Sequence, residues 1–230
     1  MKTIGLVGGM SWESSLHYYR LINQGVRERL GGLHSAKCVL VSVDFAEIEA
    51  LQMQSRWDEA ADAMVQAAQQ AADGGADCIL ICTNTMHKVA QQVQDAIPLP
   101  FIHIADATAQ AIKQQGLTTV GLLGTRFTME ETFYRGRLED IFGLQVLVPN
   151  ADDRTVVNRV IYEELVVGQV QETSRAQYRR VIQALVEAGA QGIILGCTEI
   201  GLLVKQQDSP VPLFDTTQIH AQAALDFALS

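Results

Sequence analysis

The 230-residue sequence is poor in the features that mark secreted, membrane-spanning and disulfide-stapled proteins. It has four cysteines, and three of them lie inside strand-like runs, so they do not suggest a disulfide framework. No apolar run approaches the length that spans a bilayer, and Met1-Lys2-Thr3 leads into a strand-like segment without the layout of a signal peptide. We therefore expect a cytoplasmic protein with no membrane partner.

Basic residues are also scarce. The chain has 17 Lys and Arg against 26 Asp and Glu, for a net charge of −9, and a nucleic-acid partner is not expected without a basic surface. The five lysines form no recognisable setting for a Schiff base. Four histidines show no mutual spacing typical of a metal site: His17, His34, His103 and His220. The residues thus predict neither a cofactor nor a metal.

The sequence does contain one short segment twice. Residues 76–85 (ADCILICTNT) and 190–199 (AQGIILGCTE) align at an offset of 114 (190 − 76). Each is an apolar, mostly β-branched run that is too short for a helix and that breaks abruptly into small polar residues. This pattern predicts two buried parallel strands, one ending at Thr83 and the other at Cys197.

A second repeat supports a duplication. Residues 4–9 (IGLVGG) match residues 120–125 (VGLLGT) at an offset of 116 (120 − 4), and strand-like and helical patterns alternate in both halves. We predict an α/β protein of two similar, pseudo-symmetric domains, each with a parallel sheet flanked by helices. Because ligands of such sheets bind at the carboxyl ends of the strands, we expect the active site in the cleft between the domains.

A third internal similarity suggests where the domains begin and end. Pro100 and the segment after it resemble Pro212 and the segment after it. If residues 101–104 form a strand of the second sheet, the chain from about Val211 should return to the first. This predicts an N-terminal domain of residues 1–99 plus 211–230 and a C-terminal domain of residues 100–210.

The two strand ends carry side chains suited to proton transfer. On opposite walls of one cleft, Thr83 and Cys197 could remove a proton from a carbon acid and return one to its other face, which is racemisation without a cofactor. A thiolate serves as the base if nearby donors lower the pKa of its thiol.

Polar residues at the neighbouring strand ends predict the substrate class. Five of them carry hydroxyl or amide groups suited to a substrate carboxylate: Asn84, Thr85, Thr125, Thr128 and Thr198. Glu199 is acidic and matches an ammonium group instead. Together they predict a small zwitterionic partner, an amino acid.

Residues 79–87 and 195–200, with the opening Gly8-Gly9-Met10-Ser11-Trp12-Glu13-Ser14, resemble the aspartate/glutamate racemase family, and within it the aspartate racemase branch. The resemblance covers essentially the whole chain. It implies two α/β domains, a two-base mechanism independent of pyridoxal phosphate and metal, and a homodimer. It also adds Met10 and Gln52 to the candidate substrate-binding residues.

The chain departs from the family at one catalytic position. The first family motif reads Cys-Asn-Thr, whereas this chain reads Cys82-Thr83-Asn84-Thr85, so a threonine replaces the first catalytic cysteine. Adjacent strand residues point to opposite faces, so Cys82 should face the core. A hydroxyl is a far poorer base than a thiol, which predicts asymmetry between the L and D directions. If the family's usual chirality holds, Cys197 removes the proton of an L-amino acid and Thr83 supplies one on the other face.

The sequence therefore predicts a cofactor-independent racemase of aspartate, glutamate or a wider set of amino acids. Two alternatives remain open. A single cysteine in the second half resembles the arylmalonate decarboxylases of the same superfamily, which suggests a decarboxylase or isomerase of small dicarboxylic acids. The third reading is a catalytically dead small-acid-binding protein.

Overall fold

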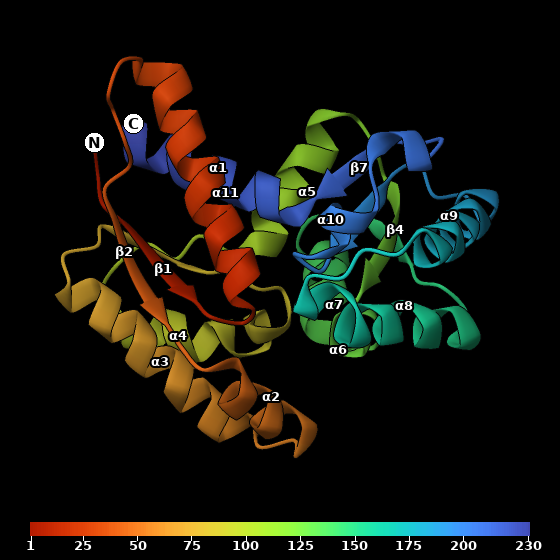
Figure 1. Ribbon diagram of the computed structural model, residues 1–230, viewed down its shortest axis with the longest axis horizontal. Helices are drawn as coiled ribbons and strands as arrows, with labels where there is room; N and C mark the ends of the chain where they lie inside the picture. Colours follow the sequence, from red (N-terminus) through yellow and green to blue (C-terminus); the bar gives the residue numbers. More distant parts are fainter. The chain divides into compact units, whose positions relative to one another are not determined.

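The computed structural model describes residues 1–230, and the chain forms two compact units (Figure 1). Unit 1 comprises Met1–Ile104 and His220–Ser230, and unit 2 comprises Ala105–Ile219. The chain therefore passes from one unit to the other twice, after Ile104 and after Ile219. None of its helices is both long enough and apolar enough to span a bilayer.

Unit 1 contains a three-stranded parallel sheet in the order β2-β1-β3. Its strands are β1 (Ile4–Gly8), β2 (Cys38–Ser42) and β3 (Cys78–Ile81). Its helical segments are α1 (Trp12–Leu30), α2 (Phe45–Met53), α3 (Trp57–Asp73), the 3-10 turn η1 (Thr85–Val89), α4 (Ala90–Ala96) and the larger part of α11 (Thr216–Leu229).

Helices cover both faces of this sheet because successive strand residues point in opposite directions. Ile4 and Leu6 pack with Tyr18 of α1 and Ala224 of α11, whereas Val7 packs on the other side among residues of α3 and α4. Figure 1 shows α1 and α11 on one side of β1 and β2, and α3 and α4 on the other. The face of α3 toward the sheet consists mainly of alanines, which allow the helix to approach the strands closely.

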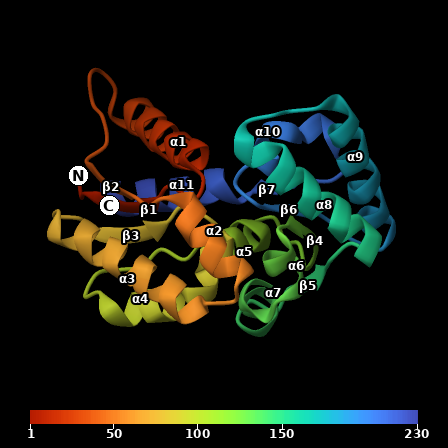
Figure 2. The ribbon, with the colours of Figure 1, turned by 60° about the horizontal axis from the view of Figure 1, so that its bottom comes forward.

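Unit 2 contains a four-stranded parallel sheet in the order β5-β4-β6-β7 (Figure 2). Its strands are β4 (Thr119–Gly124), β5 (Gln145–Leu147), β6 (Ile193–Gly196) and β7 (Leu213–Asp215). Its helical segments are α5 (Ile104–Gln114), α6 (Arg126–Glu130), α7 (Thr132–Asp140), α8 (Ala151–Glu163), η2 (Leu165–Val167), α9 (Glu172–Glu187), α10 (Ile200–Leu203) and η3 (Gln206–Asp208). Leu123 and Leu195 of the sheet pack with Val157 of α8 and Ile182 of α9.

The strand register repeats between the two sheets. Gly5 pairs with Ile79 in unit 1, and Gly121 pairs with Ile193 in unit 2, at the offsets seen in the sequence. A Cβ atom on Gly5 would lie 2.6 Å from Cδ1 of Ile79, and one on Gly121 would lie 2.7 Å from Cδ1 of Ile193. Each glycine thus makes room for the isoleucine of the neighbouring strand. The predicted duplicated α/β fold with two parallel sheets is confirmed.

The predicted return of the chain near Val211 is wrong. Strand β7 pairs with β6 in the sheet of unit 2, with Asp215 opposite Leu195, and the chain returns to unit 1 only at His220. Phe101 does not belong to the second sheet either, because it forms a bridge with Ile79 of β3. The structural boundaries therefore lie after residues 104 and 219 and not after residues 99 and 210.

Main-chain hydrogen bonds explain why the segments after Pro100 and Pro212 are similar in sequence. The N–H of Ile79 donates to the carbonyl of Pro100 at 2.9 Å, and the N–H of Ile193 donates to the carbonyl of Pro212 at 2.9 Å. The two proline segments therefore occupy equivalent edges of their own sheets. This agrees with the tendency of consecutive strands to lie side by side after a helical crossover.

His220 is a buried histidine of unit 1. Its Nε2–H donates to the carbonyl of Ile102 at 2.6 Å, so its Nδ1 accepts the hydroxyl hydrogen of Tyr18 at 2.8 Å. Burial lowers the pKa of His220 from 6.5 to about 4. The folded protein consequently holds this ring neutral at pH values at which an unfolded chain would protonate it.

This pKa predicts that lowering the pH from 7 to 5 destabilises unit 1. Between about pH 6.5 and pH 4 the unfolded chain binds a proton at His220 that the folded chain does not, so the unfolding free energy falls as the pH falls. The contribution of His220 to this loss is about 2 kcal/mol. His220→Gln can keep a donor toward Ile102 and cannot titrate, so it should lose correspondingly less stability over this range.

Denaturant unfolding at pH 7 and pH 5 measures the effect. Tryptophan fluorescence reports on unit 1, because both tryptophans, Trp12 and Trp57, lie there. His34→Gln, at an exposed loop position, is the matched control and should behave as wild type. Equal pH dependence of wild type and His220→Gln would contradict the prediction.

Candidate active site

The turn between β1 and α1 lies at the carboxyl edge of the first sheet. Gly9 has a φ of +97°, and a Cβ atom there would lie 2.2 Å from the carbonyl oxygen of Val43. Only glycine therefore allows the chain to pass the end of β2 at this point. Ser11 then caps α1, because its Oγ accepts the N–H of Ser14 at 3.3 Å.

Two further serines tie this turn to the end of β3. The Oγ of Ser15 accepts the N–H of Gly9 at 2.8 Å and donates to the carbonyl of Ser11 at 3.0 Å. The Oγ of Ser14 donates to the carbonyl of Cys82 at 3.2 Å. The first turn of α1 thus holds the ends of β1 and β3 together, beside Thr83.

Thr83 and Cys82 have different environments although they are adjacent. Cys82 packs in the core with Leu6 and Leu80, and burial raises the pKa of its thiol, so it is held neutral. This confirms that Cys82 faces the core. Thr83 follows it at the strand end, and its carbonyl oxygen lies 2.7 Å from Nδ1 of His87.

Gln52 and Met10 lie in the same unit. Gln52 is a buried residue of α2, and its Nε2 donates to Sδ of Met86 at 3.0 Å. Met10 belongs to the same hydrophobic cluster as Met86 and Ile48. Both candidates are thus connected, through Met86, to the η1 turn that follows Thr83.

In unit 2, the ends of β4 and β6 lie side by side, with Gly124 opposite Gly196. Thr125 caps the short helix α6: its Oγ1 accepts the N–H of Thr128 at 3.3 Å and lies 3.1 Å from Oγ1 of Thr128. A Cβ atom on Gly196 would lie 3.3 Å from Cγ2 of Thr128. This places both threonines near the residue after Gly196, which is Cys197.

Cys197 has a carboxylate as its direct partner. Its Sγ–H donates to Oε2 of Glu199 at 3.0 Å, and Oγ1–H of Thr198 donates to the same oxygen at 2.8 Å. All three side chains are buried, and only 8% of Cys197 is exposed. The two donors satisfy a carboxylate oxygen that would otherwise be costly to bury.

The pKa of the Cys197 thiol lies well above its usual value. Burial is the largest cause, followed by the charge of Glu199 and the hydrogen bond to it, whereas the backbone N–H groups of Glu199 and Ile200 act in the opposite direction. The resting group is therefore a neutral thiol whose proton already points at a carboxylate. Any cation that neutralises Glu199 would lower the pKa of this thiol.

A family model described as Asp/Glu/hydantoin racemase matches residues 7–224. The chain belongs to the Asp/Glu/hydantoin racemase family. This confirms the resemblance seen in the sequence motifs.

Solved structures and a curated protein similar to this chain agree with this racemase-family assignment. A protein from Yersinia pestis described as a candidate Asp/Glu racemase is 59% identical, with a TM-score of 0.94 and 100% of both chains covered. An aspartate racemase homologue from Pyrococcus horikoshii is 34% identical, with a TM-score of 0.87 and 100% of both chains covered. A broad-specificity amino-acid racemase of Bacillus subtilis, RacX, is 23% identical over 180 residues, which cover 75% of this chain and 74% of that protein.

The candidate residues of this racemase-family chain form two groups, one in each unit, and both follow the carboxyl ends of strands or pack close to them. The group in unit 1 is Met10, Gln52, Thr83, Asn84 and Thr85. The group in unit 2 is Thr125, Thr128, Cys197, Thr198 and Glu199.

No sequence pattern indicates the cluster of histidines around His87. The ring of His87 lies 4.6 Å from that of His103 and 5.7 Å from that of His220, between ring centroids. His103 and His220 are 117 residues apart (220 − 103), so no local spacing could have revealed the cluster. The buried serines of α1 were detectable in part, because Ser11 is a recognisable helix cap.

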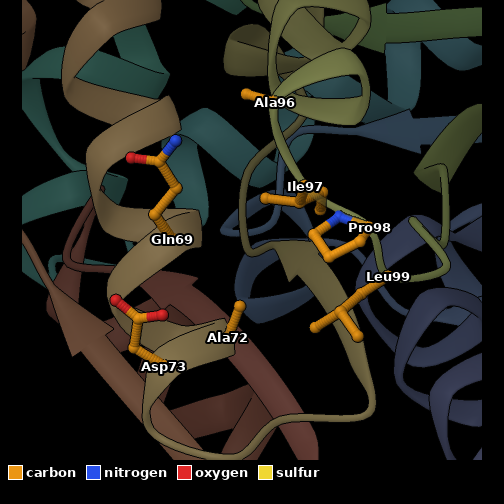
Figure 3. A pocket seen from close by; sticks show the side chains of 7 residues that line it. All are labelled: Gln69, Ala72, Asp73, Ala96, Ile97, Pro98 and Leu99. Carbon is orange, nitrogen blue, oxygen red and sulfur yellow. The ribbon is translucent and has the colours of Figure 1, made fainter.

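A pocket of about 430 Å³ in unit 1 is separate from the racemase motifs (Figure 3). It lies between the end of α3 and the segment after α4, and its lining residues are Gln69, Ala72, Asp73, Ala96, Ile97, Pro98 and Leu99. Because α3 ends just before β3 begins, this pocket lies near the amino end of β3. Thr83 follows the opposite end of the same strand.

The Cys197–Glu199 contact predicts how the thiol titrates. Glu199→Gln removes the negative charge while keeping the shape of the side chain, so the pKa of Cys197 should fall relative to wild type. Ultraviolet thiolate absorbance across a pH titration measures this, with the Cys197→Ser protein subtracted in each background. A pKa that is unchanged or higher in Glu199→Gln would show that the carboxylate does not control the thiol.

Proposed function

We propose that this family member is a cofactor-independent amino acid racemase, which removes and returns the Cα proton of aspartate, glutamate or a broader set of amino acids by means of Cys197 and Thr83. The observation that carries the proposal is the Cys197 thiol at the end of β6, hydrogen-bonded to Glu199 at 3.0 Å, in a chain of the racemase family. The carboxylate can accept the proton of the thiol through this hydrogen bond. Until a substrate cation neutralises the carboxylate, its charge also helps to keep the pKa of the thiol high.

The first step requires a thiolate. The substrate ammonium pairs with Glu199, which removes the charge that raises the pKa of Cys197, and the thiol proton is released through the hydrogen-bonded carboxylate. The thiolate then takes the Cα proton of the L-amino acid. The electron pair of the broken C–H bond moves onto the substrate carboxylate, whose oxygens are held by hydroxyl and amide donors.

The second step is protonation of the other face of Cα. The hydroxyl of Thr83, directly or through a water, donates that proton, and the hydroxyl is restored from solvent. Donation of this proton leaves the Thr83 oxygen as an alkoxide unless water re-protonates it in the same step, and removal of a Cα proton at this side needs that oxygen deprotonated first. A hydroxyl loses its proton far less readily than a thiol. Proton removal at the Thr83 side is therefore the slow half-reaction.

This asymmetry has a specific kinetic form. Free L- and D-amino acids have equal free energies, so overall kcat/KM for interconversion must be equal in the two directions. The difference between Cys197 and Thr83 is seen instead in exchange of the Cα hydrogen with solvent. Exchange is fast for the enantiomer whose Cα hydrogen faces Cys197 and slow for the one whose hydrogen faces Thr83.

The relatives support the proposed substrate range. The 34% identical Pyrococcus horikoshii structure is described as an aspartate racemase homologue, and the Bacillus subtilis relative as a broad-specificity amino-acid racemase. A panel of L- and D-amino acids that includes aspartate and glutamate is therefore the appropriate first test.

We expect Cα-hydrogen exchange in D2O to be faster with the L- than with the D-enantiomer of each substrate, as followed by loss of the Cα proton NMR signal. Cys197→Ser should lower the L-exchange rate by ~10²–10⁴-fold, because it removes the base. Cys38→Ser, which changes a cysteine outside the motifs, is the matched control and should behave as wild type. Equal exchange of both enantiomers by the wild-type protein would contradict the asymmetric mechanism.

Substitution of Thr83 tests proton transfer on the face of Cα opposite Cys197. Thr83→Cys should raise the exchange rate of the D-enantiomer by ~10²-fold or more, because a thiol is a much better base than a hydroxyl. Thr83→Val, which has nearly the same shape but no hydroxyl, should slow conversion of L to D. Conversion by Thr83→Val at the wild-type rate would remove Thr83 from the mechanism.

Two other outcomes identify the alternative functions. A single motif cysteine also suits a decarboxylase, which would release CO₂ from an arylmalonate-type diacid and would leave amino acids unchanged. A small-acid-binding protein without activity would be stabilised in thermal melts by aspartate or glutamate and would exchange no Cα hydrogen.

A further inference from the structure

His87 contacts the backbone at two points that are distant in sequence. Its Nδ1 lies 2.7 Å from the carbonyl oxygen of Thr83, and its Nε2 lies 3.2 Å from the backbone nitrogen of Ile104. The side chain is 97% buried. One ring therefore joins the backbone of the proposed proton donor to the last residue of the first segment of unit 1.

The two contacts determine the tautomer of the ring. A backbone N–H can only donate, so Nε2 must be the unprotonated acceptor, and a carbonyl oxygen can only accept, so Nδ1 must carry the hydrogen. His87 is therefore the neutral Nδ1–H form. The N–H of Ile104 selects this form, which keeps a donor directed at the Thr83 carbonyl.

Neighbouring rings keep His87 in this orientation. Its ring centroid lies 4.6 Å from that of His103 and 5.7 Å from that of Phe101. His220, also 5.7 Å away, has the opposite tautomer, because its Nε2–H donates to the carbonyl of Ile102. The 102–104 segment is thus held by one histidine that donates to it and by another that accepts from it.

We propose that His87 is a positioning residue for Thr83, which orients the Thr83 hydroxyl by holding its backbone carbonyl and which is itself oriented by Ile104. The proposal rests on the proposed function. The carbonyl bond acts on the peptide unit that joins Thr83 to Asn84, so its loss allows that turn to rotate. Cys197 lies in the other unit and does not depend on this bond.

This division predicts a selective defect. Cα exchange of an L-substrate needs only Cys197, because the thiol can exchange its hydrogen with D2O and return a deuteron to the same face. Net conversion of L to D needs Thr83 as well. Loss of the His87–Thr83 bond should therefore lower the ratio of conversion to exchange by ~10- to 100-fold, the effect of a misplaced reacting group. A purely structural role for His87 would lower both rates together.

Two single substitutions separate the two hydrogen bonds. The amide nitrogen of asparagine can occupy the place of Nδ1, so His87→Asn keeps the donor to Thr83 and loses the acceptor for Ile104. The amide oxygen of glutamine can occupy the place of Nε2, so His87→Gln keeps the acceptor and loses the donor. His87→Ala loses both, and His34→Ala in an exposed loop is the control.

We expect the ratio of conversion to exchange to stay close to wild type in His87→Asn and His34→Ala, and to fall in His87→Gln and His87→Ala. Equal ratios in all four variants would overturn the positioning role while leaving the racemase proposal intact. Absence of Cys197-dependent exchange in the wild-type protein would instead reject the proposed function itself.

The tautomers can be tested on the wild-type protein without catalysis. Long-range ¹H–¹⁵N correlation spectra of histidine-labelled wild-type protein should show an Nδ1–H ring for His87 and an Nε2–H ring for His220. His87→Asn and His220→Gln assign the two signals by their disappearance. An Nε2–H or doubly protonated His87 at neutral pH would overturn the inference.

Discussion

Parallel strand pairing in one register determines which side chains reach the carboxyl edge of each sheet. Gly5 opposite Ile79 and Gly121 opposite Ile193 are the same pairing used twice, and each glycine admits an isoleucine that would clash with any Cβ. A shift of one residue would exchange the two faces of a strand. The register therefore determines that Cys82 enters the core and that Thr83 is the first residue beyond it.

The local partners of the four cysteines explain why only one of them is suited to chemistry. Burial raises the pKa of Cys38 to about 11 and that of Cys78 to about 12, and it also raises the pKa of Cys82. None of these three has a carboxylate hydrogen-bond partner, whereas Cys197 donates to Glu199. Burial alone makes a thiol inert, whereas the carboxylate of Glu199 is an acceptor to which the proton of Cys197 can move.

The same carboxylate makes the pKa of the thiol sensitive to any charge placed beside Glu199. Burial and, after it, the uncompensated charge of Glu199 raise the pKa of Cys197, so the thiol stays protonated in the free protein. An ammonium group would compensate that charge. This contact would remove the part of the pKa elevation that comes from Glu199, while the part that comes from burial would remain.

Much of the fold could be predicted because its signals are local. The short apolar runs before Thr83 and Cys197 each lie within a single segment, and each corresponds to an observed strand. Local signals were less reliable where the backbone breaks without proline or glycine. Helices α6 and α7, for example, are separated only by Glu131, whose extended conformation (φ −87°, ψ 160°) ends the first helix and begins the second.

The sequence by itself determined the duplication, the racemase family and the candidate residues at the strand ends, since periodicity and motif spacing are properties of short stretches. Only the tertiary structure decided which sheet edge each proline segment extends and which histidines meet around His87. Tyr18 and His220 are 202 residues apart, and His220 and Ile102 are 118 apart. Such contacts depend on helices packing across a sheet, and no short stretch of sequence contains both partners.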